Sequence, residues 1–294
     1  MHTNEPSEII LQNSRLRVEL AQPGTFYNGS RFDHNGFITG VVLDGRHTFC
    51  VPESMTEGEG SGGCGFCGEF GIDEAIGYDE TQVGASFLKV GVGQIKRPDD
   101  VPYNFFRPYE FLPAASELTF GEGSVTFAVR AESCNGYAYA YQKTVRIQEN
   151  RMTIAYTLEN TGAKRITTTE YCHNFVGINR LPVNGGYQLA FSNMQALNRE
   201  VGNVYARDGV ITWPDEPMEK QYYCQPKAAP GGGYCWRLVN RQAGVGVSES
   251  DNFTPCKLAL WGYRHVVSPE VFVRIDLAPG ETQQWARTYE FFDL

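Results

Sequence analysis

The sequence predicts an all-β protein that folds as a large antiparallel β-sandwich. Short segments that alternate polar and apolar residues, or are rich in Val, Ile, Tyr and Phe, recur along the whole chain. The 294 residues include 32 Gly, 15 Pro, 18 Phe, 16 Tyr and 4 Trp, a composition typical of β-proteins. No period of about 20 to 50 residues repeats, which argues against solenoids and propellers. We therefore expect one domain over residues 1–294.

The strands expected in the first half of the chain follow from local patterns. Residues 15–20 alternate charged side chains with Leu and Val. Residues 37–43 and 87–93 are rich in Val, Leu and Phe, and residues 124–130 alternate again. The segment Leu43-Asp-Gly-Arg46 supplies residues that tolerate a positive φ, as a hairpin turn requires.

The second half of the chain continues the pattern. Residues 137–147 and 151–158 read as a hairpin whose turn, Gln148-Glu-Asn-Arg151, offers Asn150 for the positive φ. Residues 164–171 contain three consecutive Thr, which are β-branched and favour extended backbone. The last expected strands cover residues 235–239, 271–277 and 284–292.

Charge and hydrophobicity exclude several classes of protein. The net charge is −9 with a pI near 5.2, and the basic residues are scattered singly, which argues against nucleic-acid binding. No apolar stretch approaches the roughly 20 residues of a membrane span. The first residues lack a basic segment followed by an apolar one, so we expect a cytoplasmic protein whose eight cysteines are thiols.

Two regions hold side chains suited to catalysis. His173 lies at the end of the Thr-rich strand, where a satisfied structural histidine and a catalytic one are both open readings. Nearer the C-terminus, Trp261, Arg264 and His265 precede Glu270. Because Pro269 keeps the residue before it extended, Glu270 is either a carboxylate projected from a loop onto the end of the sheet or a solvated charge beside a turn.

At this point the sequence resembles a known family. The segment Glu170-Tyr-Cys-His-Asn-Phe175 is similar to the catalytic-histidine strand of the aldose 1-epimerases, the galactose mutarotase-like proteins. The segment from Leu277 to Phe291, with its Pro-Gly-Glu turn, resembles the last hairpin of that superfamily. The resemblance implies an antiparallel β-super-sandwich whose concave face binds a free sugar.

The resemblance also implies an isomerase chemistry without metal or organic cofactor, in which the sugar ring opens and recloses as the other anomer. A general base removes the C1 hydroxyl proton while a general acid protonates the ring oxygen. Mapped onto this chain, His173 is the acid and Glu270 the base, with Glu170 as a substitute for Glu270. We expect nearby carboxylates to keep His173 protonated and Arg264 to keep Glu270 ionised.

The sequence leaves open which sugar is bound and whether it is free or phosphorylated. The early Asn-His-Pro and Gly-Arg motif of the family is replaced by a glycine-rich segment, residues 62–72, and no Arg cluster announces a phosphate. The aromatic cluster over residues 103–111 is either a sugar platform or a plug at one end of the sandwich. Residues expected to contact the sugar are Arg31, Glu69, Lys89, Tyr109, Glu170, Trp261 and Arg264.

Other readings remain beside this one. Cys64 and Cys67 form a CxxC motif, but a structural zinc site normally needs a second ligand pair, and a redox motif needs a thioredoxin-like context, so packing is favoured. A cupin-like metal enzyme using His173 and His265 lacks the close His-x-His spacing. A non-catalytic carbohydrate-binding protein of the same fold is the alternative function. The expected partner is a small-molecule sugar, with no nucleic acid and no membrane, in a monomer or homodimer.

Overall fold

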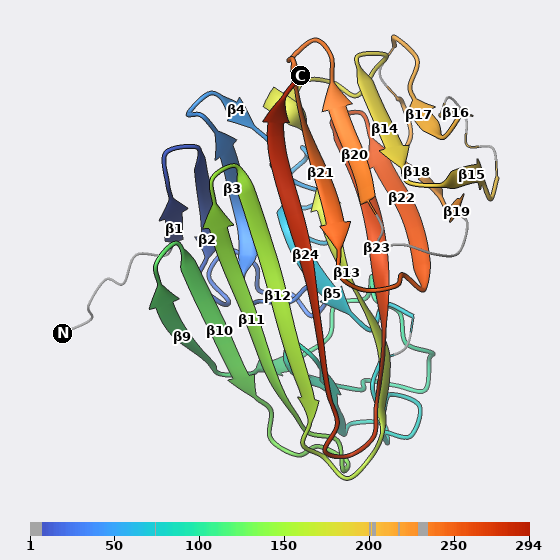
Figure 1. Ribbon diagram of the computed structural model, residues 1–294. Helices are drawn as coiled ribbons and strands as arrows, with labels where there is room; N and C mark the ends of the chain where they lie inside the picture. The colour runs from blue at the N-terminus through green and yellow to red at the C-terminus, as the bar shows by residue number, and fades with distance from the viewer. Residues whose placement is uncertain (1–7, 74, 200, 202–203, 217, 229–234) are drawn as a thin grey trace.

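The computed structural model describes residues 8–73, 75–199, 201, 204–216, 218–228 and 235–294, and two large antiparallel sheets account for most of them. Figure 1 shows the sheets packed face to face. Within these residues there is no α-helix, only a short 3-10 turn, Ile178–Arg180. The all-β antiparallel sandwich predicted from the sequence is confirmed.

Within the described part of the chain, nine strands form the first sheet. They are β1 (Glu8–Gln12), β2 (Leu16–Ala21), β3 (Phe37–Leu43), β4 (His47–Thr48), β5 (Gly65–Phe70), β13 (Ile166–Phe175), β18 (Tyr222–Cys224), β22 (Lys257–Tyr263) and β23 (Val266–Leu277). Their order is β1-β2-β3-β5-β13-β23-β22-β18, with β4 paired to β3. Strands β13 and β23, which are far apart in sequence, therefore lie side by side near the middle of the sheet (Figure 1).

Ten strands from the described residues form the second sheet. They are β9 (Ser116–Gly121), β10 (Ser124–Arg130), β11 (Tyr139–Gln148), β12 (Arg151–Asn160), β14 (Tyr187–Phe191), β16 (Tyr205–Arg207), β17 (Val210–Thr212), β20 (Cys235–Asn240), β21 (Val245–Asp251) and β24 (Thr282–Asp293). They run in the order β16-β17-β14-β20-β21-β24-β12-β11-β10-β9. Two small sheets complete the fold, one of β6 (Ser86–Lys89), β7 (Gly93–Lys96) and β8 (Phe111–Pro113), the other of β15 (Met194–Leu197) and β19 (Pro226–Ala228).

The core between the two large sheets is built by the two-residue period of the strands. Every second residue of β12 is buried, and Tyr156 on this strand stacks on Trp285 of β24 with ring centroids 4.9 Å apart. The same layer holds fully buried Trp236, Tyr141 and Tyr289. Aromatic rings of this size bury large apolar areas, so they dominate the energetics of the sandwich.

A buried cluster of charges also lies between the sheets. Arg287 on β24 is fully buried and donates to Glu170 at 2.6 Å and to Glu249 at 3.1 Å, with Asp251 at 3.8 Å. We refer to these four residues as the Arg287 cluster. Burial, followed by the charge of Glu249, raises the pKa of Asp251 to about 10, so Asp251 is protonated at neutral pH. One guanidinium thus pairs with both remaining carboxylates, Glu170 and Glu249.

Some strand predictions were wrong in their details. The run 87–93 is not one strand, because the chain turns between β6 and β7 with Gly91 at φ 79°. In the β11–β12 hairpin, Glu149 and not Asn150 has the positive φ, 52°, whereas the side chain of Asn150 donates to the carbonyl of Phe291 at 2.7 Å. Strand β23 begins at Val266, earlier than predicted, so Pro269 lies inside it.

Gly65, at the start of β5, is held in a conformation that only glycine fits. Its φ is 55°, and a Cβ atom built on it would lie 2.2 Å from the carbonyl oxygen of Ile38. We expect Gly65→Ala to lower the free energy of unfolding by at least about 2 kcal/mol, from backbone strain together with the clash. The matched control is Gly45→Ala, because Gly45 has φ 66° but open space around its Cβ position. Urea unfolding of both variants is the measurement, and equal losses would show that the clash is absent.

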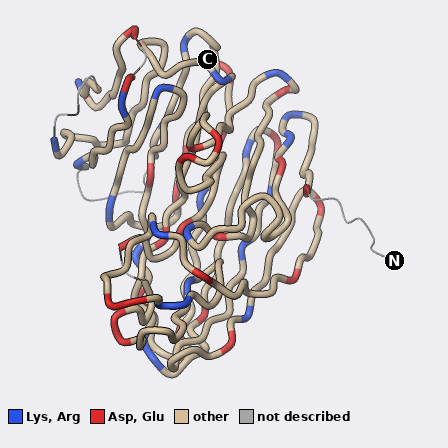
Figure 2. Tube along the Cα trace, turned by 180° about the vertical axis from the view of Figure 1, so that it is seen from behind, with Lys and Arg blue, Asp and Glu red and all other residues tan. Residues whose placement is uncertain are grey.

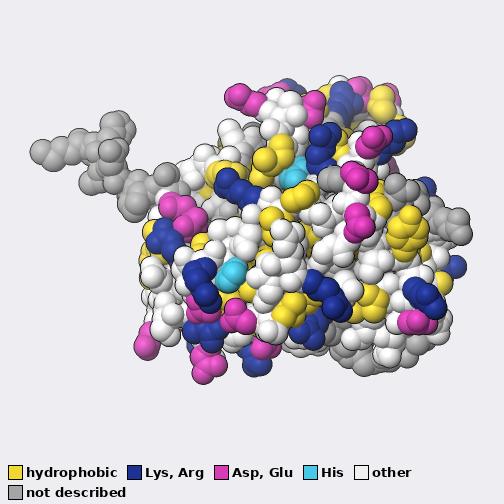
Figure 3. Space-filling view, turned by 90° about the horizontal axis from the view of Figure 1, so that it is seen from above, with side chains coloured by type: hydrophobic (Ala, Val, Ile, Leu, Met, Phe, Trp, Pro, Cys, Tyr) yellow, Lys and Arg dark blue, Asp and Glu magenta, His cyan; other side chains and the backbone are white. Residues whose placement is uncertain are grey.

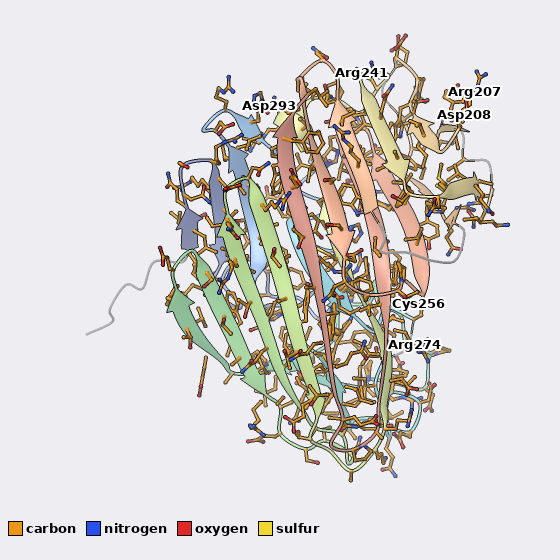
Figure 4. All side chains as sticks on the ribbon, viewed as in Figure 1. Arg207, Asp208, Arg241, Cys256, Arg274 and Asp293 are labelled. Atoms are coloured by element: carbon orange, nitrogen blue, oxygen red, sulfur yellow. The ribbon has the colours of Figure 1, made fainter. Side chains whose placement is uncertain are left out.

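The surface mixes charge signs. Figure 2 shows Lys and Arg positions interspersed with Asp and Glu positions over both sheets, and in Figure 3 hydrophobic side chains are scattered among them. At the tip of the β16–β17 turn, Arg207 and Asp208 form an exposed ion pair at 3.6 Å (Figure 4), which contributes at most about 1 kcal/mol. No helix among the described residues has the length and apolar character to cross a membrane.

Candidate active site

The residues that could carry chemistry meet on the face of the nine-stranded sheet that points away from the second sheet. Tyr171 on β13 pairs with Phe272 on β23. The same register continues to a bridge between Val176 and Val267, and it sets His173 opposite Glu270. Side chains directly opposite on adjacent strands lie on the same face and are close neighbours. The sheet register alone therefore brings this histidine and this carboxylate together.

His173, Glu270 and Ser268 form a closed hydrogen-bonding group. The Nε2 atom of His173 lies 3.4 Å from Oε1 of Glu270, and its Nδ1 atom lies 2.8 Å from Oγ of Ser268. Ser268 Oγ is also 3.3 Å from Oε1 of Glu270, and it accepts the backbone N–H of Asn174 at 3.0 Å. Both polar groups are nearly buried, because His173 and Glu270 are each 4% exposed. The hydroxyl of Ser268 thus holds the imidazole ring of His173 so that its Nε2 atom faces the carboxyl group of Glu270.

Burial sets the protonation of this pair. It raises the pKa of Glu270 to about 8, although the charge of Arg31 acts in the opposite direction. Burial, with a smaller effect of Arg31, lowers the pKa of His173 well below 6.5. At neutral pH the pair thus holds one proton, which lies on the carboxyl group. The expectation of a protonated His173 beside an ionised Glu270 was wrong, because loss of hydration outweighs the neighbouring charges.

Arg31 lies to one side of the hydrogen-bonding group formed by His173, Glu270 and Ser268. Its guanidinium donates to Glu69 at 2.9 Å and to the hydroxyl of Tyr171 at 3.3 Å, while Tyr171 donates to Glu69 at 2.6 Å. On the other side, Arg31 donates to Ser61 at 2.9 Å and lies 3.7 Å from Glu53. These contacts fix a buried arginine, 6% exposed, at the wall of a cavity.

The cavity above these side chains has a volume of 530 Å³. Trp261 of β22 packs edge-on to His173, with ring centroids 5.4 Å apart. Lys257, on the same strand, pairs with Asp73 at 3.0 Å. The lining residues are Arg31, Glu53, Ile72, Asp73, Phe105, Phe106, Tyr171, His173, Arg199, Gln221, Tyr222, Tyr223, Lys257, Trp261 and Glu270.

A second cavity of 840 Å³ lies beside β15, β16 and β17. Asp208 is the only carboxylate among its described lining residues, and no histidine is present there. It therefore offers no acid and base pair, so the first cavity is the candidate active site.

Four of the residues predicted from the sequence line the candidate site together: His173, Glu270, Arg31 and Trp261. Glu69 is fully buried one layer behind, where it holds Arg31, and Lys89 lies 3.7 Å from Glu69. Tyr109 packs in a separate hydrophobic cluster, stacked on Tyr103 with centroids 5.6 Å apart. The last three thus support the wall without lining the cavity.

Two other predicted residues lie elsewhere. Glu170 points to the opposite face of β13, because adjacent residues of a strand alternate, and it binds Arg287 in the core. Glu170 was therefore wrong as a substitute base. Arg264 is exposed and contacts the ring of Tyr263, away from Glu270. The positive charge near Glu270 comes from Arg31 instead.

The cysteines of the CxxC motif are packing residues in this structure. Cys67 on β5 belongs to a hydrophobic cluster with Cys64 and Phe175, and burial raises the pKa of the Cys64 thiol to about 12. Cys256, labelled in Figure 4, is exposed, and it is a free thiol, as Cys64 and Cys67 are. Among the residues that the structure describes, no group of three or more His, Cys, Asp or Glu side chains could hold a metal ion.

Sequence reasoning missed Ser268, Lys257 and Tyr223. Ser268 could have been found from the strand period, since it lies two residues before Glu270 and shares its face once β23 is extended to Val266. Lys257 and Tyr223 reach the cavity only through the pairing of β22 with β23 and β18. That pairing joins distant segments and leaves no local signal.

Solved structures of other proteins have the same arrangement of strands. A galactose mutarotase-like protein from Lactobacillus casei superposes with a TM-score of 0.57 at 13% identity, covering 97% of this chain and 100% of that chain. The chain has the galactose mutarotase-like fold. A galactose mutarotase related enzyme from Lactobacillus acidophilus (TM-score 0.59, 11% identity, 97% of each chain) shares this fold. So does the aldose epimerase homologue from C. elegans (TM-score 0.59, 12% identity, 98% of this chain and 99% of that chain).

No family model and no curated protein sequence matches the chain. The resemblance expected from the sequence is thus confirmed at the level of the galactose mutarotase-like fold. At identities of 11% to 13%, the shared fold does not specify the activity or the sugar, so these must be argued from the site.

Proposed function

We propose that the protein is an aldose 1-epimerase-like isomerase, which interconverts the α and β anomers of a sugar by opening and reclosing its ring. The supporting observation is the pair of His173 and Glu270, 3.4 Å apart on one wall of the cavity. Ring opening requires one group that gives a proton and one that takes a proton at the same time. A pair that shares a single proton meets both needs.

The proton moves in a closed cycle. With the proton on Glu270, the carboxyl group donates it to the ring oxygen while Nε2 of His173 accepts the proton of the C1 hydroxyl. The C1–O5 bond breaks, a carbonyl forms at C1, and neither the sugar nor the pair gains net charge. After rotation about the C1–C2 bond, the reverse transfers close the ring on the other face of the carbonyl. The family resemblance assigns His173 as the acid and Glu270 as the base. That assignment uses the same two residues, with the shared proton on His173 instead of Glu270.

The surrounding residues have supporting roles in this proposal. Ser268 holds Nδ1 of His173, which leaves Nε2 directed to the cavity side. Trp261 offers an apolar edge for the C–H face of a sugar, and Arg31 offers N–H groups for hydroxyl oxygens. The reaction transfers protons between oxygen and nitrogen atoms and breaks and re-forms the C1–O5 bond without any change of oxidation state, so we expect it to need neither metal nor organic cofactor.

The test is anomer exchange measured by NMR on free and phosphorylated aldoses, with wild type compared with His173→Asn. We expect exchange to be accelerated for at least one sugar and to fall by a factor of about 10² or more in the variant. His47→Asn is the matched control. His47 is on β4, is hydrogen-bonded to Asn179, and is not among the residues that line the cavity. If a sugar binds but its anomer exchange is not accelerated, the proposed enzymatic activity is refuted, and the protein is a carbohydrate-binding protein of this fold.

A further inference from the structure

The pairing of β13 with β23, both described in full, is interrupted beside the reacting pair. Backbone partners run along the two strands as far as Tyr171 and Phe272, and the same register resumes at a bridge between Val176 and Val267. In that bridge each residue donates its N–H to the carbonyl of the other, at 3.2 Å and 2.9 Å. Hydrogen-bonded pairs of this kind alternate with non-hydrogen-bonded pairs along antiparallel strands. The pattern of backbone bonds expected in the interval is therefore defined.

This register places Asn174 opposite Pro269 at the next hydrogen-bonded position. His173 and Glu270 follow as a non-hydrogen-bonded pair, in which facing side chains lie closest together. Proline has no N–H, so the bond from residue 269 to the carbonyl of Asn174 cannot form, and that carbonyl accepts the N–H of Val176 at 2.8 Å. Proline is rare in a central strand, and a broken local rule is typical of a functional site.

Groups of Asn174 fill this gap. Its side-chain Nδ2 donates to the carbonyl of Pro269 at 2.6 Å, and its backbone N–H donates to Oγ of Ser268 at 3.0 Å. The carbonyl of Pro269 belongs to the peptide bond with Glu270, so the first contact fixes the peptide plane that carries the carboxyl side chain. Ser268 Oγ lies 2.8 Å from Nδ1 of His173, so the second contact orients the imidazole. One residue thus holds both members of the pair.

Asn174 is itself fixed from the opposite sheet. Its side chain is fully buried, and its Oδ1 atom accepts the hydroxyl of Tyr289 on β24 at 3.0 Å. Its Nδ2 atom also donates to Glu249 on β21 at 3.2 Å, and the other oxygen of Glu249 accepts Arg287 at 3.1 Å. An amide bonded at both ends has a single orientation. The second sheet therefore braces the reacting pair through Asn174.

We propose that Asn174 is a positioning residue, which sets the distance and relative orientation of His173 and Glu270 across the gap at Pro269. The inference rests on the proposed function, because that function makes these two side chains the reacting groups. Asn174 contacts the core and is not among the residues that line the cavity, so it acts through its neighbours and not on the sugar. Such positioning matters because a displacement of about 1 Å can lower a rate about 10²-fold.

The same contacts assign the tautomer of His173. The hydroxyl of Ser268 donates to Oε1 of Glu270 at 3.3 Å, and its oxygen accepts the backbone N–H of Asn174. The remaining lone pair of Ser268 Oγ accepts from Nδ1 of His173, so Nδ1 carries the ring hydrogen. Nε2, which lies 3.4 Å from Glu270, is then the acceptor that the mechanism requires. The tautomer thus reports the geometry of the pair without any sugar present.

The test replaces Asn174 by leucine, which has a similar volume but no side-chain hydrogen bonds. We expect kcat for anomer exchange to fall about 10- to 100-fold and KM to change less than about twofold, because no cavity contact is lost. NMR on protein with ¹⁵N-labelled histidine, with the His173 signals identified by their loss in His173→Asn, should show the Nδ1-protonated tautomer in wild type and a mixture of tautomers in Asn174→Leu. Wild-type kcat with a single tautomer in Asn174→Leu would overturn the inference.

Tyr289→Phe is the matched control. It removes the bond to Oδ1 of Asn174 but leaves the contacts of Asn174 with Pro269 and Ser268. The midpoint of urea unfolding should fall, while kcat and the tautomer stay as in wild type. An equal loss of kcat in Tyr289→Phe and Asn174→Leu would mean that any damage to the core slows the reaction, and the positioning role would be overturned.

Pro269→Ala decides the question if Asn174→Leu does not fold. Alanine supplies the missing N–H, so the backbone can pair with the carbonyl of Asn174 and close the gap. We expect this variant to fold, and its kcat to be lower than that of wild type by about fivefold or more, with KM unchanged. An unchanged kcat in Pro269→Ala would show that the gap does not position the pair, which overturns the inference.

The proposed function and this inference fail in different ways. If anomer exchange is accelerated and Asn174→Leu leaves kcat unchanged, the positioning role is overturned while the proposed function stands. If the wild type accelerates exchange of no sugar, the proposed function fails, and the tautomer of His173 decides the inference. A single tautomer that becomes mixed in Asn174→Leu but not in Tyr289→Phe supports positioning of the pair, and any other pattern overturns it.

Discussion

Replacing Glu270 by glutamine is expected to lower the rate of anomer exchange by a factor of about 10² to 10⁴. Glutamine keeps the shape of the side chain but neither gives up nor accepts the proton that the pair shares. The variant should still bind sugar, because the other wall residues are unchanged, so the loss should be in kcat and not in KM. Steady-state exchange rates by NMR, with binding by calorimetry, separate the two.

The pH profile tests the same carboxyl group. Since the pKa of Glu270 is raised to about 8, kcat/KM of the wild type should be flat near neutral pH and fall above pH 8, as the shared proton is lost. On the acid side it should fall only well below pH 6.5, where His173 takes up a proton. A rate that instead rose through pH 8 would contradict the shared proton, because it would indicate a base that acts alone.

The free energy of unfolding also depends on the pKa of Glu270. A carboxyl group whose pKa is about 8 in the folded state and about 4.5 when unfolded favours folding fully below pH 4.5, and this contribution is lost as the pH rises to 8. The glutamine variant should therefore be more stable than wild type at pH 8 by roughly 2–4 kcal/mol, and should differ little at pH 4.5. Urea unfolding at both pH values checks the sign.

Replacing Arg287 by methionine is expected to have the largest effect on stability. The change removes the guanidinium that Glu170 and Glu249 share at 2.6 Å and 3.1 Å and leaves buried carboxylates without a counter-ion. Breaking a buried ion pair from one side costs about 3–5 kcal/mol. The midpoint of urea unfolding should fall with the m-value unchanged.

The matched control for Arg287 is Arg151→Met on the neighbouring strand β12. Arg151 is 59% exposed and pairs with Glu290 at 3.1 Å, so its loss should cost no more than about 1 kcal/mol. The cost of Arg287→Met should also shrink between pH 8 and pH 5, because the unpaired carboxylates then take up protons and burial no longer opposes them. A cost that does not change over this range would mean that water reaches the cluster.

Much of the fold could be predicted from local patterns. Strands such as β2, β10 and β12 alternate apolar and polar residues, because one face of each is buried, and this period is visible in the sequence. The early start of β23 was not visible, since Pro269 usually marks the limit of a strand. In the structure Pro269 nevertheless pairs with Leu260 of β22, and its carbonyl accepts a side-chain N–H of Asn174 at 2.6 Å.

The site was predictable to a smaller extent. His173 stood out as a polar residue at the end of a β-branched strand, whereas Glu270 was expected before a strand and was assigned through the family resemblance. The protonation of the two groups was not predictable, because it depends on burial from all sides. The place of Arg264 was not predictable either, because it is near Glu270 in sequence but contacts Tyr263 on the surface. Arg31, whose charge acts on Glu270, comes from the loop between β2 and β3, and no local pattern predicts where this loop places it.

The division of the candidate site between strands and loops has an evolutionary consequence. His173, Ser268 and Glu270 come from the central strands β13 and β23, whereas Phe105 and Phe106 come from a loop before β8. Loops accept insertions and substitutions that central strands do not. Descendants of such a protein can thus exchange one ligand for another by altering the loop, while inheriting the reacting pair unchanged.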